Sequence, residues 1–328
     1  MSDTRHPRKH FSVAPMMDWT DRHCRYFLRL LSPSVELYTE MVTAAAVHHG
    51  DADRLLRFDA AEHPVVVQLG GSEPELMAAA AVRAAEEGYD EININVGCPS
   101  DRVQSGQFGA CLMADPALVA RCYRAMSEAV DIEVSVKSRI GIDDKDSFDF
   151  LDEFVTTLAE AGCRKFIVHA RIALLSGLSP KENRSIPPLK YPRVYRLKEA
   201  HPELEIIING GIQSLEDVDA VIGHVDGVMI GREAYHNPYF LTLLEQRLGS
   251  AVTPPQRADV VEAMLPYIDR ELAAGTRLHS ITRHMLGLFA GQPGARAWRR
   301  FLSENARGND AAASVLTDAL EAIRRVAA

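Results

Sequence analysis

Long apolar segments are absent from this chain. No run of apolar residues approaches the ~18 that a membrane-spanning helix needs. The first ten residues, MSDTRHPRKH, are basic but lack the apolar stretch of a secretory signal. We therefore expect a cytoplasmic protein without a membrane partner, and nothing in the sequence implies a protein partner.

Paired cysteines are absent as well. An odd, scattered set without any C-x-x-C argues against a disulfide framework and against a zinc site. We therefore expect no metal, and at least one thiol is free to be buried filler or a reactive group. The five cysteines are Cys24, Cys98, Cys111, Cys122 and Cys163.

An excess of positive charge is also missing, since the net charge is -9. This total disfavours a nucleic-acid partner, although binding depends on where basic residues cluster rather than on their sum. With 47% hydrophobic and 25% charged residues the composition is that of a globular protein. The 328 residues suffice for one large domain and a small one.

Short β-branched runs alternate with helical patterns up to about residue 235. Strands are expected at 11–17, 35–42, 65–69, 91–96, 132–139, 166–170, 205–209 and 227–230, with helices such as 73–87, 116–129 and 148–161 between them. An open doubly wound sheet would predict a G-x-G-x-x-G after the first strand, and none is present. The pattern predicts an α/β fold, a (β/α)8 TIM barrel over residues 1–249.

The pattern changes after Gly249. Pro254-Pro255 follows a short linker, and no strand-like run appears beyond it. Helices are expected at 256–274, 278–290, 295–306 and 311–327. Residues 250–328 are therefore predicted to form a small C-terminal all-α bundle.

Polar residues follow successive apolar strands. The active site of a (β/α)8 barrel lies at the carboxyl ends of its strands. A purely structural barrel has no reason to place Gln, Asn, Lys and His at these points, so we predict an active site there. The residues in question are Pro15, Met16, Met17, Gln68, Asn95, Cys98, Lys137, Arg139, His169, Arg171, Asn209, Gly210, Gly211, Gly231 and Arg232.

The ends of the seventh and eighth strands indicate a phosphate site. Barrels often bind phosphate there through backbone N–H groups of glycine-rich turns. Asn209-Gly210-Gly211 and Gly231-Arg232 supply such turns, and the arginine adds charge-assisted bonds. Gln68 and Lys137 would then face the headgroup of a phosphorylated ligand; the alternative is two ordinary turns.

Lys137 and Cys98 each allow more than one interpretation. Lys137 could form a Schiff base, stabilise negative charge on a ring that is being reduced, or form a core salt bridge. Cys98 has no histidine near it in sequence. An ordinary thiol is mostly protonated at neutral pH, which suits a proton donor better than a nucleophile.

These residues carry a resemblance to the tRNA-dihydrouridine synthases, and within them to the A-type, or 20/20a, subfamily. The resemblance spans both predicted domains, and GLSPKENR and PGARAWRR are its most specific segments. The matching segments are APMMDWTDRHCRYF at 14–27, VVVQLGGS at 65–72, INVGCPSDRVQSGQFGACLM at 94–113, VKSRIGID at 136–143, VHAR at 168–171, GLSPKENRSIPPLKY at 177–191, INGGI at 208–212, MIGREAYHNP at 229–238 and HMLGLFAGQPGARAWRRFLSE at 284–304.

The resemblance implies an FMN-dependent oxidoreductase that uses NADPH to reduce the C5–C6 bond of uridines 20 and 20a in the tRNA D-loop. It implies that Cys98 protonates C5 after hydride reaches C6. Asn95 would read the uracil edge. The flavin would be held by Pro15, Met16, Met17, Gln68, Lys137, His169, Asn209, Gly210, Gly211, Gly231 and Arg232.

Two basic clusters would contact tRNA phosphates. Lys181 and Arg184 lie three residues apart in the loop after the sixth strand. Arg296, Arg299 and Arg300 have the i, i+3, i+4 spacing of one helical face. On spacing alone such a face is more often merely solvated, and the resemblance favours RNA binding.

One stretch departs from the resemblance, and other functions compete with it. Residues Ile172-Ala173-Leu174 replace the basic and aromatic residues common there in the A-type subfamily, in a loop where the family contacts RNA. The alternatives are a flavin dehydrogenase acting on a free pyrimidine, a Schiff-base aldolase at Lys137, and a non-catalytic RNA-binding barrel.

Overall fold

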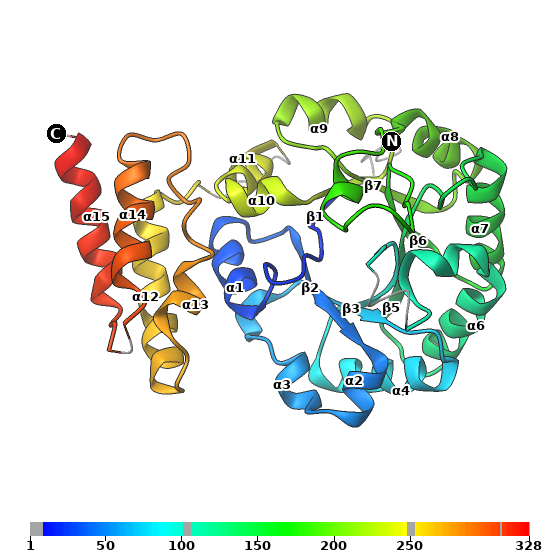
Figure 1. Cartoon of the computed structure of the whole chain (residues 1–328), viewed down its shortest axis with the longest axis horizontal. Coiled ribbons are helices and arrows are strands. Elements are labelled where there is room, and N and C mark those ends of the chain that lie inside the picture. Colours follow the sequence, from blue (N-terminus) through cyan, green and yellow to red (C-terminus); the bar gives the residue numbers. More distant parts are fainter. Residues whose placement is uncertain (1–8, 101–105, 248–252, 309, 328) are drawn as a thin grey trace, which may run out of the picture. The chain divides into compact units, whose positions relative to one another are not determined.

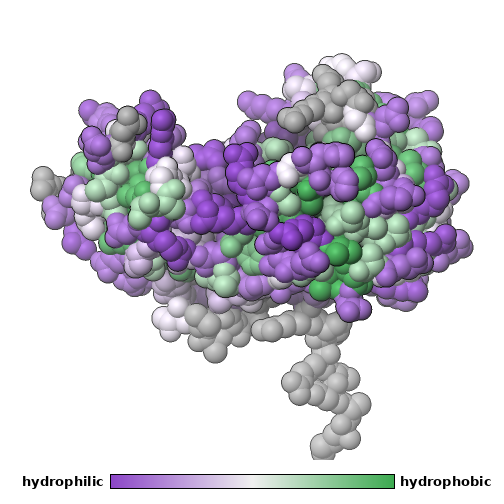
Figure 2. Space-filling view, turned by 90° about the horizontal axis from the view of Figure 1, so that it is seen from below, coloured by the Kyte–Doolittle hydropathy of each residue, from purple (hydrophilic) through white to green (hydrophobic). Residues whose placement is uncertain are grey.

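The computed structural model describes residues 9–100, 106–247, 253–308 and 310–327. These residues form two compact units. The barrel unit comprises the chain up to Met17, Glu36–Phe58 and His63–Gly231, and the helical unit comprises Asp18–Val35, Asp59–Glu62 and the chain from Arg232. No helix in the described ranges is long and apolar enough to cross a membrane. Hydrophilic and hydrophobic side chains are interspersed on the face shown in Figure 2.

The barrel unit confirms the predicted (β/α)8 fold. Eight parallel strands close in the order β1 to β8, with β1 paired to β8 (Figure 1). The first strand is shorter than the 11–17 expected, because it ends at Val13 and Pro15 lies outside the ladder. The strands are β1 (His10–Val13), β2 (Glu36–Thr43), β3 (Val65–Gly70), β4 (Glu91–Val96), β5 (Glu133–Arg139), β6 (Lys165–His169), β7 (Glu205–Asn209) and β8 (Gly227–Ile230).

Several helices on the outside of the barrel begin at side-chain caps that the sequence supplies. Asp115 and Ser147 accept backbone N–H groups at two of these helix starts, and Ser214 forms a capping box at a third. The helical segments of this unit are α2 (Ala44–His49), α3 (Ala52–Leu56), α4 (Pro74–Glu87), η2 (Gly109–Ala114), α6 (Pro116–Ser127), α7 (Phe148–Glu160), η3 (Glu182–Arg184), α8 (Tyr191–Ala200) and α9 (Leu215–Ile222).

The helical unit contains more than the predicted C-terminal bundle, because helices before residue 249 belong to it. The helix expected at 278–290 ends at Thr282, and turns follow. A Cβ at Gly287 would lie 2.4 Å from the carbonyl oxygen of His236, so this segment runs against backbone. The helices are α1 (Arg22–Leu31), η1 (Ala60–Glu62), α10 (Arg232–His236), α11 (Phe240–Arg247), α12 (Arg257–Ala273), α13 (Leu278–Thr282), α14 (Ala295–Asn305) and α15 (Ser314–Ala327).

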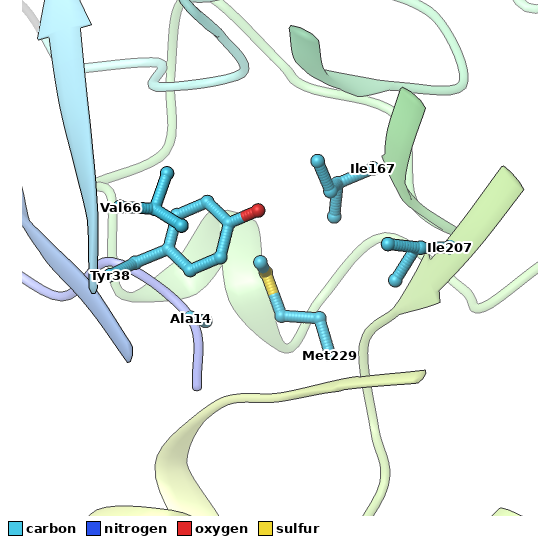
Figure 3. Close-up of a cluster of buried hydrophobic side chains, with 6 residues drawn as sticks. All are labelled: Ala14, Tyr38, Val66, Ile167, Ile207 and Met229. Carbon is cyan, nitrogen blue, oxygen red and sulfur yellow. The ribbon is translucent and has the colours of Figure 1, made fainter. Parts of the chain in front are cut away.

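The barrel interior is apolar on one side. Side chains from five strands and from the end of β1 point toward one another there, as Figure 3 shows. Each is at most 6% exposed, so the barrel is filled with side chains rather than hollow. The cluster consists of Ala14, Tyr38, Val66, Ile167, Ile207 and Met229.

An ion cluster lies at the amino ends of the strands. The ammonium of Lys165, the first residue of β6, is 2.8 Å from Glu91 and 3.0 Å from Glu36. His10 adds a contact of 3.5 Å to Glu36. The Lys165 side chain is 1% exposed, and the carboxylates raise the pKa of its ammonium despite burial. This end of the barrel therefore depends on a buried positive charge.

We predict that Lys165→Met lowers the free energy of unfolding by about 3 kcal/mol, because Glu91 would remain buried without its cation. Urea unfolding at neutral pH measures this. Lys198→Met is the control, since Lys198 pairs with Asp226 at the partly exposed rim. Equal losses in the two variants would contradict a special role for Lys165.

Candidate active site

The carboxyl ends of the strands bring the predicted polar residues together. Side chains two residues apart on a strand share a face, so β4 presents Asn93 and Asn95 to the barrel interior and β5 presents Ser135 and Lys137. The register places Asn95 opposite Lys137. It also places His169 opposite Asn209, on the next two strands of the barrel. We call this rim of side chains the barrel mouth.

Two amides join the strands to the loop that carries Cys98. Asn95 accepts the backbone N–H groups of Gly97, at 3.1 Å, and of Cys98, at 3.0 Å, through Oδ1. Its Nδ2 donates to Gln68 Oε1 at 2.7 Å. The Cys98 thiol is partly exposed and lies 3.5 Å from the Ser100 hydroxyl. The position of the thiol is therefore set by the end of β4.

Two cations of β5 occupy the mouth. Lys137 donates to Asn209 Oδ1 at 3.2 Å. Burial, reinforced by Arg139 and opposed by Cys98, lowers the pKa of Lys137 to about 7. Arg139 is 3% exposed and donates to the carbonyls of Gly97 (3.2 Å) and Asn183 (2.9 Å), which ties the Cys98 loop to the loop after β6.

His169 is neutral at physiological pH. Burial holds the pKa of its imidazole well below the usual range, and the charges of Arg139, Lys137, Arg171 and Arg184 lower it further. Positive charge thus gathers around the end of β6 from four side chains. Such a concentration favours an anionic ligand.

The turn after β7 admits only glycine. Gly210 and Gly211 have φ of +116° and +78°. A Cβ on Gly210 would lie 2.6 Å from the His169 ring, and one on Gly211 would lie 2.4 Å from Leu189. In contrast, no described atom lies within 4 Å of a Cβ built on Gly231, so the backbone after β8 faces open space.

The remaining predicted residues lie on the surface or next to the mouth. Pro15 and Met16 follow β1, and the Met17 side chain is 56% exposed. Arg232 begins α10 directly after Gly231. Lys181 and Arg184 are exposed at η3, and Arg184 acts electrostatically on His169. Arg296, Arg299 and Arg300 are exposed on α14, in the other unit.

Sequence reasoning missed residues that support the mouth. Arg139 was recognised as a strand-end cation, but its role as a clamp on three carbonyls was not predicted. Asn183 is fully buried and bonds to both backbone groups of Leu174. Asn93 joins Gln68 to Ser135 inside the barrel. Only the alternation of polar residues along β4 could have indicated Asn93.

A closed (β/α)8 barrel with a cationic, glycine-lined mouth at the carboxyl ends of its strands is typical of a barrel enzyme. A comparison with protein families makes this specific: the profile of dihydrouridine synthase (Dus) matches residues 12–324. The chain belongs to the dihydrouridine synthase family. Enzymes of this family depend on a flavin and reduce uridine in tRNA to dihydrouridine, so the chain is not an aldolase.

Similar proteins share nearly the whole chain. One from Shewanella oneidensis is 57% identical over 325 residues, which are 99% of this chain and 97% of that protein. One from Escherichia coli K12 is 60% identical over 315 residues, which are 95% of this chain and 91% of that protein. One from Vibrio cholerae is 58% identical over 314 residues, which are 95% of this chain and 96% of that protein. All three are named tRNA-dihydrouridine(20/20a) synthase.

We predict a pH-dependent stability that originates at Lys137. Its folded-state pKa, about 7, lies below the ordinary value of 10.5. Between these values only the unfolded chain binds the proton, so stability falls as the pH drops from 10.5 to 7 and levels off below. Between pH 7 and pH 9, the free energy of unfolding of flavin-free wild type should rise by about 2 kcal/mol more than that of Lys137→Met.

Urea unfolding of wild type, Lys137→Met and the control Lys145→Met at both pH values measures this effect. Lys145 is exposed outside the mouth, with its ammonium 5.8 Å from the Phe150 ring. A pH dependence that survives in Lys137→Met would show that another group is responsible.

Proposed function

We propose that this chain reduces the C5–C6 double bond of uridines 20 and 20a in the D-loop of tRNA, with FMN as cofactor and NADPH as reductant. The observation that carries the proposal is the mouth itself: Lys137 lies close enough to His169 to act on it electrostatically, and Asn95 joins Gln68 to the Cys98 loop. The names of relatives at 57–60% identity support the same substrate and positions. Because tRNA is the proposed substrate, we propose the cytoplasm as the place of action.

The residues present fit a flavin with a phosphate. Gly210 and Gly211 allow the backbone to turn tightly, and the open space at Gly231 leaves room for an anion next to the backbone. The phosphate would be held by these glycines with Asn209 and Arg232. The ring would lie against Pro15, Met16 and Met17 and contact Gln68, Lys137 and His169.

Lys137 and Cys98 would have complementary tasks. The bound flavin supplies a hydride for C6 of uracil. Lys137, whose pKa of about 7 lets it carry a positive charge at neutral pH and below, would stabilise negative charge beside the ring. Cys98 would hold the proton that C5 requires. Its thiol is partly exposed in a loop fixed by Asn95 and Arg139, as a positioned donor needs.

The structure narrows the proposed role of Asn95. Its Oδ1 already accepts two backbone N–H groups, and one N–H of its Nδ2 donates to Gln68. The second Nδ2 N–H is the group left to donate to an edge of the uracil. We therefore propose Asn95 as a donor to the base rather than an acceptor.

We propose that tRNA binds Lys181 and Arg184 of the barrel unit and Arg296, Arg299 and Arg300 of α14. All five side chains are exposed. On α14 the opposite face is anchored by Trp298, which is buried and donates to the Met285 carbonyl at 2.9 Å. The arginine face is thereby held in one orientation. Arg300 also contacts Glu304 at 2.9 Å, a pair so exposed that it stabilises little.

The activity test uses unmodified tRNA, FMN and NADPH, with dihydrouridine located by mass spectrometry. Wild type should be yellow, with flavin absorption near ~450 nm, and should modify positions 20 and 20a. Cys98→Ala should keep the flavin but lose at least about 100-fold in turnover, since general acids contribute about 10²–10⁴-fold.

Cys111→Ala is the matched control, because Cys111 is also partly exposed and lies in η2, which follows the Cys98 loop along the chain. Full turnover in Cys98→Ala would remove this thiol from the mechanism. A protein that takes up no FMN, or that forms dihydrouridine elsewhere in tRNA, would contradict the proposed cofactor or the proposed positions.

Removing the charges of Arg296, Arg299 and Arg300 should weaken tRNA binding and flatten its salt dependence, by about one unit of slope for each phosphate that is no longer bound. Titrations of tRNA at several salt concentrations measure both. Arg324→Ala, an exposed arginine of α15, serves as control. Unchanged affinity and slope in the triple variant would show that RNA does not bind this face.

A further inference from the structure

A row of hydrogen bonds crosses the barrel interior behind the mouth. Gln68 Nε2 donates to Asn93 Oδ1 at 2.8 Å, and Asn93 Nδ2 donates to Ser135 Oγ at 2.8 Å. The Ser135 hydroxyl donates to Glu91, the acid that Lys165 holds. The register makes these residues direct neighbours, with Gln68 opposite Asn93 and Asn93 opposite Ser135.

The direction of this row is fixed from the Cys98 loop. Backbone N–H groups can only donate, so the atom of Asn95 that faces Gly97 and Cys98 must be its oxygen. Its nitrogen then faces Gln68, which must present its oxygen to Asn95 and its nitrogen to Asn93.

Asn93 must in turn present its oxygen to Gln68 and its nitrogen to Ser135. The Ser135 oxygen accepts that bond, which leaves the hydroxyl proton for Glu91. Reversing any one amide would set two donors or two acceptors against each other. Asn93 and Ser135 are fully buried, so such a mismatch would cost about 1–3 kcal/mol.

We propose that Asn93, supported by Ser135, is a positioning residue: it holds the Gln68 amide in the orientation that directs the second Nε2 N–H to the flavin and keeps Asn95 locked onto the Cys98 loop. The flavin part of this proposal rests on the proposed function. The lock on the Cys98 loop does not, because every bond in it lies within the chain.

The test compares Asn93→Leu with Asn93→Asp. The two side chains are similar in size, but only aspartate keeps an acceptor for Gln68. Toward Ser135 the carboxylate of Asn93→Asp cannot donate, so the Ser135 hydroxyl must donate to this carboxylate instead of to Glu91. FMN affinity, from quenching of flavin fluorescence in flavin-stripped protein, should fall about tenfold in Asn93→Leu relative to Asn93→Asp, a usual effect for residues that orient a contact. Equal affinity in the two variants would overturn the proposed direction of the row.

The thiol tests the lock without any cofactor. In flavin-free protein, the alkylation rate of Cys98 should change in Asn93→Leu and stay near wild type in Asn93→Asp. Cys111 in the same molecules serves as internal reference, measured on its own peptide. If the alkylation rates of Cys98 and Cys111 change by the same factor, the substitution has made the whole protein more mobile, and the proposed effect of Asn93 on the Cys98 loop would be overturned. If wild type binds no FMN, the proposed function fails while this measurement still decides the lock.

Ser135 offers a milder matched set. Ser135→Ala should weaken FMN binding about threefold, the scale of one hydrogen bond, and Ser135→Thr should restore it. Ser138→Ala is the control, because Ser138 is equally buried on β5 and its hydroxyl has no hydrogen-bond partner within the described residues. The role of the Ser135 hydroxyl would be overturned if Ser135→Ala and Ser138→Ala bound FMN equally well. It would also be overturned if Ser135→Thr did not restore FMN affinity.

Discussion

Buried positive charge at the barrel mouth is the constraint on which the site depends. Lys137 and Arg139 face the interior, and in the described ranges neither is paired with a carboxylate. Their partners are neutral oxygens, from an amide side chain and from loop carbonyls. Neutral oxygens satisfy the donors without neutralising the charge, so the mouth retains the field that an anionic ligand needs.

The amino ends of the strands also contain a buried positive charge, but there the charge is paired with carboxylates. There Lys165 is surrounded by Glu36 and Glu91, and its positive charge is matched. A matched, buried cluster contributes to the fold and leaves no field for a ligand. The amino ends of the strands therefore contribute to the stability of the fold, and the carboxyl ends form the site. This division is expected of a (β/α)8 barrel.

The sequence predicted the fold and the types of residue at the mouth, because both follow from local patterns. Strand positions came from β-branched runs, and the strand-end residues followed from those positions. The contacts of Arg139 could not be predicted, since Gly97 and Asn183 meet it only after three separate segments come together. The helix expected through residue 290 was wrong for a similar reason: its periodicity continues, but backbone packing at Gly287 decides the conformation.

The row from Glu91 to Asn95 connects the two ends of the barrel, and its chemistry limits what it can transmit. Asn and Gln amides neither gain nor lose protons near neutral pH, so the row cannot carry a proton from Glu91 to Cys98. The row can fix the orientation of each amide by that of its neighbour, because each amide has one donor side and one acceptor side. A proton that Cys98 would deliver can therefore not be replaced through this row, although the thiol also contacts Ser100 of its own loop. The row that we propose to orient the Cys98 loop is therefore separate from any route by which a proton would return to Cys98.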